Sequence, residues 1–385
     1  MIKNLFKFGS IVEGSYFTNR TAEIEKINSI LNSKNHLIII SPRRFGKTSL
    51  IKKVVSELNR PNIYLDLQVI TSIEDLSAQL LKRIYRIYPS EKFKTILKSL
   101  KILPTVSINP LNNEIDISFQ AVQSDVVLIE DVFNLINKLS ARKNPIIVIF
   151  DEFQSIKDIG KDLDKKLRAV IQHHQKVNYV FLGSQESLMR DIFEKKKSPF
   201  YHFGYMLPIS KIPFKEFAEY LNKRFAKISS DSYKLSEAVL AVTNAHPYYT
   251  QQLAFTIFDL LQKEFKEKSV VDESINELLQ IHDMDFERLW NTLNKTDKKI
   301  LIGMSKYKIS PMAGEFSSKV QINSSSTIFS SLKRLMIKGV VIQSNSTYEI
   351  DDPFFKRWII KKEICENDKI QLVKTGTKNC RDKAA

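Results

Sequence analysis

The stretch Leu37-Ile-Ile-Ile-Ser-Pro-Arg-Arg-Phe-Gly-Lys-Thr48 decides how the first half of this chain is expected to fold. Four apolar residues lead into a pattern that fits G-x-x-x-x-G-K-[ST], except that Ser41 stands in the first glycine position. An amphipathic stretch follows, so the order is buried strand, loop, helix. In such a loop the backbone N–H groups wrap a phosphate, Gly46 lets the backbone approach it closely, and the helix amino terminus adds a positive dipole end.

We therefore expect the loop and the first helical residues to bind the phosphates of a nucleotide. Lys47 would bridge the β- and γ-phosphates and contribute to catalysis, and the Thr48 hydroxyl would ligate Mg²⁺. The alternative interpretation is a chance strand, loop and helix that happen to contain Gly-Lys-Thr. The candidate phosphate-binding residues are Ser41, Pro42, Arg43, Arg44, Phe45, Gly46, Lys47, Thr48 and Ser49.

Two further apolar runs end in polar residues. Ile146-Ile-Val-Ile-Phe-Asp-Glu152 would deliver Asp151 to the carboxyl edge of the sheet to hold Mg²⁺ through water, with Glu152 as the general base. Tyr179-Val-Phe-Leu-Gly-Ser-Gln185 would bring Ser184 or Gln185 to the attacking water or the γ-phosphate, provided its strand lies between the other two. The alternatives are a strand end with a capping acid and a structural turn.

The pattern around these motifs predicts an α/β fold. Continuous apolar runs at 37–40, 63–67, 146–150 and 179–182 are typical of parallel strands that are covered on both faces. Amphipathic helical stretches lie between them, at 48–58, 73–88, 127–139 and 161–174. Residues 104–108 and 114–119 alternate apolar and polar residues around 109–113, which indicates a β-hairpin insertion.

The rest of the chain predicts two helical parts. From 214 to about 293 the pattern is helical, and Pro247 is placed to begin a helix. Residues 297–358 show a helix, a short helix, a longer helix and two strands, which is the order of a winged helix. The expected domains are a 1–210 core with its hairpin at about 104–119, a 211–293 helical lid, a 294–362 winged helix and a 363–385 flexible tail.

Charge bears on possible partners. The 385 residues include 59 Lys and Arg against 43 Asp and Glu, a net charge of +16, which suits a polyanion or simply a lysine-rich surface. Residues 296–362 hold 12 Lys and Arg against five acids, and Lys333, Arg334 and Lys338 lie on the expected recognition helix. These three are candidates for contacts with nucleic-acid phosphates; the alternative is that the winged helix is an intramolecular lock.

Composition also restricts the setting of the protein. Only two cysteines occur, so neither a disulfide framework nor a Cys-rich zinc site is expected. No run approaches about 18 apolar residues, and the amino terminus lacks the pattern of a signal peptide. We expect a cytoplasmic protein without a membrane partner.

Taken together, the motifs resemble the archaeal-type ATPase family of the AAA+/STAND branch of P-loop NTPases, which is also found in bacteria. The resemblance covers about 14–360 and implies ATP binding and hydrolysis with Mg²⁺ by an AAA-type core, a helical lid and a winged helix. Five segments carry it: Phe17-Thr-Asn-Arg20-Thr-Ala-Glu23, Pro42-Arg-Arg-Phe-Gly-Lys-Thr-Ser-Leu50, Phe150-Asp-Glu-Phe-Gln154, Phe181-Leu-Gly-Ser184 and Ala245-His-Pro-Tyr-Tyr-Thr-Gln251.

The resemblance also implies roles outside the phosphate loop. Phe17, Asn19 and Arg20 would lie near the adenine or frame its pocket, Pro247 would close the lid over the base, and His246 would lie near the phosphates. Ala245 replaces the usual lid glycine, which questions the tightness of that turn.

A second departure concerns the arginine finger. Residues 198–205 lack the arginine that many relatives carry, so a finger from that segment is absent. Arg43, Arg44 or Arg190 would have to compensate, and slow or partner-activated hydrolysis is expected.

Two functions follow from this resemblance. The first is an ATP-hydrolysing conformational switch that acts on a macromolecular partner, either an unidentified protein or a second copy of the chain. The alternative is a DNA-binding AAA+ ATPase that resembles origin-recognition or transposition-helper ATPases. Adenine rather than guanine is implied by the resemblance, and the chain has no Asn-Lys-x-Asp guanine-reading motif.

Overall fold

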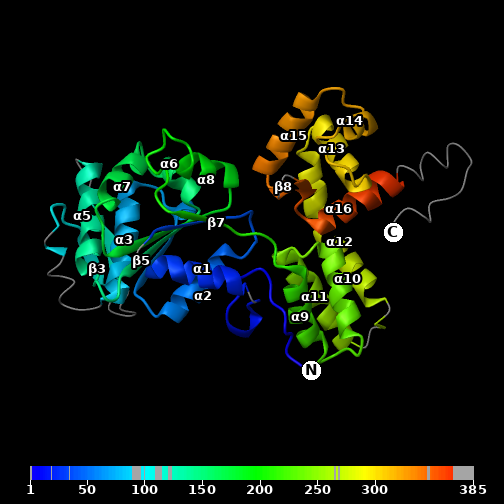
Figure 1. Cartoon of the computed structure of the whole chain (residues 1–385), viewed down its shortest axis with the longest axis horizontal. Coiled ribbons are helices and arrows are strands. Elements are labelled where there is room, and N and C mark those ends of the chain that lie inside the picture. The colour runs from blue at the N-terminus through cyan, green and yellow to red at the C-terminus, as the bar shows by residue number, and fades with distance from the viewer. Residues whose placement is uncertain are drawn as a thin grey trace, which may run out of the picture. The chain divides into compact units, whose positions relative to one another are not determined.

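A computed structural model of the chain shows two compact units (Figure 1). One unit is the continuous segment Arg20–Ile209, and the other joins Met1–Asn19 to Ser210–Ala385. The structure describes residues 2–18, 20–33, 35–88, 97–98, 100–108, 115–119, 124–263, 266–267, 269–344 and 347–366.

The first unit is built on a five-stranded parallel sheet with the order β2-β5-β6-β1-β7. Strand β6 lies between β1 and β5, which is the strand order that the roles expected for Ser184 and Gln185 require. The strands are β1 (Leu37–Ile40), β2 (Asn62–Asp66), β5 (Ile146–Asp151), β6 (Val177–Gly183) and β7 (Tyr205–Pro208).

Helices cover both faces of this sheet (Figure 1). On one face, alternate strand residues such as Ile38, Val148 and Phe181 share a core with α3, α5, α7 and α8. The other face is covered by α1 and α2 (Figure 1), which explains why β1, β5 and β6 are buried along their whole length. The helices and turns of this unit are α1 (Thr21–Asn32), α2 (Lys47–Leu58), η2 (Leu67–Val69), α3 (Ile73–Ile87), α5 (Asp125–Leu139), η3 (Phe153–Ser155), α6 (Ile156–Ile159), α7 (Leu163–Ile171) and α8 (Glu186–Phe193).

The structure differs from the sequence-based expectation in two places and contains the predicted hairpin. Strand β7 was not predicted; it pairs with β1 at the sheet edge and is only partly buried, so it lacks a continuous apolar run. Helix α7 is shorter than 161–174, because Gly160 and an Asp162 with φ 55° precede it. The predicted hairpin is present as the antiparallel pair β3 (Thr105–Ile108) and β4 (Ile115–Ser118), while its turn at 109–113 lies outside the described residues.

The second unit contains four long helices followed by a winged helix-turn-helix. Part of the amino-terminal segment packs on these helices: Phe6 is buried against Tyr220, Phe225 and Phe258. The elements are η1 (Gly14–Tyr16), α9 (Phe214–Phe225), α10 (Ser232–Thr243), α11 (Pro247–Gln262), α12 (Val270–Asn291), α13 (Lys295–Lys306), α14 (Gly314–Val320), α15 (Ser325–Ile337), β8 (Val341–Ser344), β9 (Thr347–Ile350), α16 (Pro353–Ile359) and the π-helical η4 (Ile360–Glu366).

One hydrophobic core runs through the lid helices and the winged helix. Helix α12 joins them: its Phe286 and Trp290 pack against Phe355 and Trp358 of α16. Trp358 Nε1 also donates to Asp283 Oδ1 of α12 at 2.7 Å. The lid and the winged helix therefore do not have separate cores.

Helix η4 extends to Glu366, past residue 363, where the tail was expected to begin; residues 367–385 lie outside the described part. None of the described helices combines the length and the apolar character needed to span a membrane.

Candidate functional site

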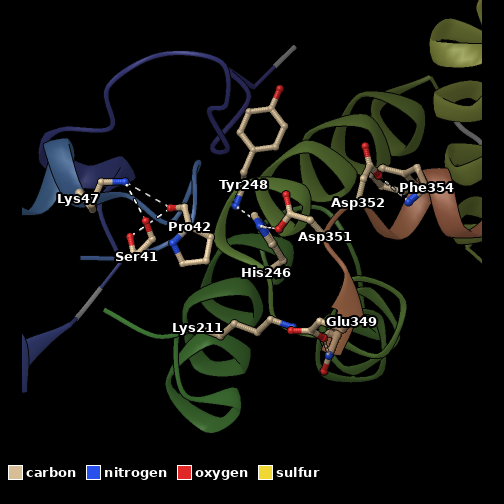
Figure 2. Close-up of polar contacts among 11 residues, drawn as sticks. Ser41, Pro42, Lys47, Lys211, His246, Tyr248, Glu349, Asp351, Asp352 and Phe354 are labelled. Carbon is tan, nitrogen blue, oxygen red and sulfur yellow. Dashed lines mark hydrogen bonds and ion pairs between the residues drawn. The ribbon is translucent and has the colours of Figure 1, made fainter. Parts of the chain in front are cut away.

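The loop between β1 and α2 curves around the amino terminus of α2. Arg44 (φ 65°) and Gly46 (φ 87°) both adopt left-handed backbone conformations, which glycine adopts without a steric penalty. Lys47 Nζ lies 3.3 Å from the carbonyl oxygens of both Ser41 and Pro42, so the ammonium caps its own loop (Figure 2). Burial lowers the pKa of Lys47, while the neighbouring Glu152 and Asp151 carboxylates act in the opposite direction.

The remaining loop residues divide between the interior and the surface. Ser41, Phe45 and Ser49 are buried, whereas Arg43 and Arg44 are exposed and Pro42 is half-buried.

Arg20 braces this loop from the start of α1. Its guanidinium is 3% exposed, donates to the Phe45 carbonyl oxygen at 3.0 Å and pairs with Glu23 at 2.7 Å. Arg20 thus contacts the phosphate loop itself. Asn19, which precedes it, lies outside the described residues.

Asp151, the last residue of β5, is the focus of three hydrogen bonds. Its Oδ2 accepts from Thr48 Oγ1 at 2.8 Å and from Tyr64 Oη at 2.5 Å, and its Oδ1 accepts from the Glu152 backbone N–H at 3.0 Å. A hydroxyl and a carboxylate in contact are the hard oxygen donors that Mg²⁺ prefers. Thr48 and Asp151 therefore fit a Mg²⁺ ion whose other ligands are phosphate and water, although no cluster of three or more His, Cys, Asp or Glu side chains suited to a metal occurs among the described residues.

Glu152 follows directly and has a left-handed backbone with φ 50°. Its Oε2 accepts from the Ser184 hydroxyl at 2.6 Å, from the Ser184 backbone N–H at 3.3 Å and from Gln154 Nε2. Gly183, at the end of β6, leaves no room for a side chain, since a Cβ there would lie 2.3 Å from Met189 Cγ and 2.8 Å from Gln154 Oε1. Gln185 is the N-cap residue of α8, beside Ser184.

The lid candidates belong to the second unit. His246 is the N-cap residue of α11, with Pro247 at the first helical position, and its Nδ1 accepts from the Tyr248 N–H at 3.2 Å (Figure 2). Its Nε2 lies 3.3 Å from Asp351 Oδ1, just beyond β9. Ala245 adopts φ 53°, so the turn forms with the conformation that the usual glycine would favour. Phe17 is half-buried after η1.

Two more contacts join this region to the wing. Lys211 Nζ lies 2.7 Å from Glu349 Oε1 (Figure 2). Asn244 Nδ2 donates to Glu349 Oε2 at 2.8 Å. Asp352 caps α16 by accepting from the N–H groups of Phe354 and Phe355. The acids beside the wing are therefore engaged within the unit.

The candidate nucleic-acid residues of α15 have different surroundings. Lys333 is exposed, and Lys338, the C-cap residue, donates to the Thr292 carbonyl oxygen at 3.4 Å. Arg334 donates to Asp297 Oδ1 at 2.8 Å, and that carboxylate, 2% exposed, also accepts from the Ser331 hydroxyl. Arg190, considered as a compensating arginine, pairs with Glu194 on its own helix.

Three residues near the site were missed in the sequence. Tyr64 and Asp66 lie on β2, and Gln154 lies in η3. Burial raises the pKa of Tyr64, and the Asp151 carboxylate raises it further, so this phenol stays protonated as a donor. Burial also raises the pKa of Asp66, the register partner of Asp151. The one signal in the sequence was that β2 ends in an acid, as β5 does.

Comparisons with known proteins assign families to two parts of the chain. A family model described as an ATPase domain predominantly from Archaea matches residues 17–253, and one described as a probable winged helix domain matches 284–361. No curated protein sequence matches the chain.

Among solved structures, the Walker-type ATPase PABY2304 of Pyrococcus abyssi is similar with a TM-score of 0.66 at 17% identity, covering 92% of this chain and 99% of that one. The ORC2 protein of Aeropyrum pernix, in ADPNP-ADP complexes, gives a TM-score of 0.53 at 16% identity and covers 97% of this chain and all of that one (100%). At these identities the likeness shows the fold.

Proposed function

The chain belongs to the family of ATPase domains found predominantly in Archaea, and from this premise we propose that it binds ATP with Mg²⁺ and hydrolyses it to ADP and phosphate. One observation carries the proposal. At the carboxyl edges of three neighbouring strands, Lys47 follows β1, Asp151 ends β5 and contacts Thr48, and Ser184 follows β6 and contacts Glu152. The ADPNP-ADP complexes of the similar ORC2 protein support an adenine nucleotide.

Each residue has a distinct task in this proposal. Lys47 exchanges the carbonyl oxygens of its loop for phosphate oxygens, and the loop N–H groups and the α2 amino terminus complete the phosphate site. Thr48 and Asp151 would hold Mg²⁺, which supplies charge neutralisation on the phosphates when bound. Glu152 takes a proton from the water that attacks the γ-phosphorus while the bond to the ADP oxygen breaks.

A pair of variants tests this proposal. Lys47→Ala should abolish ATP binding, because the ammonium is the main side-chain charge available to the β- and γ-phosphates. Glu152→Gln is the matched control at the same site: it should keep ATP binding and lose turnover, because an amide cannot accept the proton. Isothermal calorimetry and phosphate release measure the two properties. Unchanged ATP affinity in Lys47→Ala would contradict the phosphate-loop assignment, and wild-type turnover in Glu152→Gln would remove Glu152 as the base.

We further propose that the lid and the winged helix form the moving part of a nucleotide-dependent switch that acts on a protein partner or a second copy of the chain. The support is the set of contacts between the lid and the wing: Lys211, before α9, and Asn244, before α11, with Glu349, and His246 with Asp351. His246 and Pro247, implied to face the nucleotide, would thus also meet the winged helix. In this proposal the winged helix is an internal lock.

DNA binding is the second candidate function. It is favoured by the exposed Lys333 and by the excess of basic residues in 296–362. Arg334 contributes less in this account, because its guanidinium already neutralises the buried Asp297 carboxylate.

Two double variants separate the lock from DNA binding. Glu349→Gln with Asp351→Asn should raise basal ATP turnover or nucleotide exchange several-fold if the wing locks the lid; Glu315→Gln, an exposed acid of the same module, is the control. Lys333→Ala with Lys338→Ala should flatten the slope of log affinity against log salt by about 2 if both lysines meet DNA phosphates. A basal rate that does not change in the acid variant would contradict the lock, and an unchanged salt slope would contradict DNA binding through α15.

A further inference from the structure

The Tyr64 hydroxyl contacts the Asp151 carboxylate, which is proposed to hold Mg²⁺. Asp151 Oδ2 accepts hydrogen bonds from two hydroxyl groups, Thr48 Oγ1 at 2.8 Å and Tyr64 Oη at 2.5 Å. Asp151 is 5% exposed, so these contacts, together with the Glu152 N–H on Oδ1, replace water around the carboxylate. Of the three donors, Tyr64 alone comes from outside the phosphate loop and the end of β5.

The strand register explains how Tyr64 arrives there. In the parallel pair of β2 and β5, Tyr64 is the register partner of Ile149, and Asp66 is that of Asp151. Residues two apart on a strand share a face, so Tyr64 and Asp151 are diagonal neighbours on one face, within reach of an aromatic side chain. The intervening Leu65 points into the opposite core.

Two helices fix the tyrosine in this position. Lys52 Nζ of α2 lies 5.4 Å from the centre of the Tyr64 ring, a cation–π contact. Arg83 Nε of α3 donates to the Tyr64 carbonyl oxygen at 2.5 Å, which holds the strand backbone. The phenol is thus oriented before any ligand binds.

We propose that Tyr64 is a positioning residue for Mg²⁺: its hydroxyl holds the Asp151 carboxylate in the orientation that serves the cation. The inference rests on the proposed function and deepens it. Without the phenol, Thr48 would be the single side-chain donor to Asp151, and the Thr48 hydroxyl oxygen is itself a proposed Mg²⁺ ligand. The carboxylate would then have more freedom to rotate, and part of the binding energy of the cation would be lost in ordering it.

The test is Mg²⁺-dependent binding of AMP-PNP to the full chain. Tyr64→Phe removes only the hydroxyl and keeps the ring over which Lys52 lies. We expect the affinity for AMP-PNP in excess EDTA to stay at the wild-type value, and the gain in affinity on adding MgCl₂ to fall about tenfold, as expected for losing a hydrogen bond to a charged group. The Mg²⁺ concentration for half of the effect should rise accordingly.

Tyr179→Phe is the matched control, because Tyr179 is a buried tyrosine of the same sheet whose hydroxyl bonds to His174 instead. It should leave the Mg²⁺ dependence unchanged. If Tyr64→Phe shows the wild-type gain with MgCl₂, or loses affinity equally in EDTA and in MgCl₂, the inference is overturned and the proposed function stands. If the wild type binds no AMP-PNP under either condition, the proposed function fails and the inference fails with it.

Discussion

At the scale of single residues, two histidines near the amino-terminal ends of the strands lack a compensating charge: His174 is buried and His36 is half-buried. His174 Nδ1 lies 2.7 Å from the Tyr179 hydroxyl, and its Nε2 lies 3.3 Å from Asn134 Oδ1. His36 Nδ1 accepts from the Tyr179 N–H at 3.2 Å. The pKa of both histidines is lowered to about 4, mainly by burial; for His36 the nearby Arg168 and His174 contribute to this shift.

These two histidines predict a loss of stability in mild acid. Their pKa is lower in the folded chain than in the unfolded one, so below about pH 6.5 the unfolded state binds more protons. Stability should fall as the pH drops from 6.5 towards 4, by about 2 kcal/mol per histidine between pH 7 and 5. Urea unfolding of the first unit measures this. His36→Asn should roughly halve the fall in unfolding free energy between pH 7 and 5. His173→Gln changes an exposed histidine nearby and should leave this fall unchanged. An equal fall in the wild type and both variants would refute the assignment.

Motif spacing predicted which residues meet at the site, but not what surrounds them. Thr48 and Asp151 are 103 positions apart, and the strand–loop–helix and strand–acid patterns were enough to expect them at one sheet edge. Tyr64 belongs to no motif, and Gln154 ends the Phe150–Gln154 segment without an assigned role. Their contacts depend on the order of the strands and on the face of the sheet to which each side chain points. Neither can be determined from the sequence of one five-residue strand. The partners of Glu152 were therefore only partly predictable.

At the scale of elements, strands that are buried on both faces were easy to predict, whereas of the two edge strands only β2 was predicted. β1, β5 and β6 are continuous apolar runs because helices cover both sides of the sheet. β7 is an edge strand with partly exposed residues and a terminal proline, so its signal is weak. The contact between the lid turn and the wing was also beyond prediction, because it joins segments that are about 100 residues apart, such as Asn244 and Glu349.

At the scale of the whole molecule, the shared core means that the lid and the winged helix should unfold as one cooperative unit, apart from Arg20–Ile209. Trp358 is the residue on which to test this, because it is 3% exposed, packs against Trp290 and Phe355, and donates to Asp283. Trp358→Ala should cost about 3–5 kcal/mol, as other large truncations in cores do.

Amide hydrogen exchange distinguishes a common core from two separate ones. In Trp358→Ala, exchange should accelerate in α10 and α11 of the lid as well as in α13 and α15, because the loss of one packing layer lowers the free energy of opening the whole unit. Exchange in β1 and β5 should keep its wild-type rate, since those strands belong to the other core. Acceleration confined to α13–α16 would mean that the winged helix opens on its own. The lid and the winged helix would then not move as one rigid body, which would contradict a switch in which they move together.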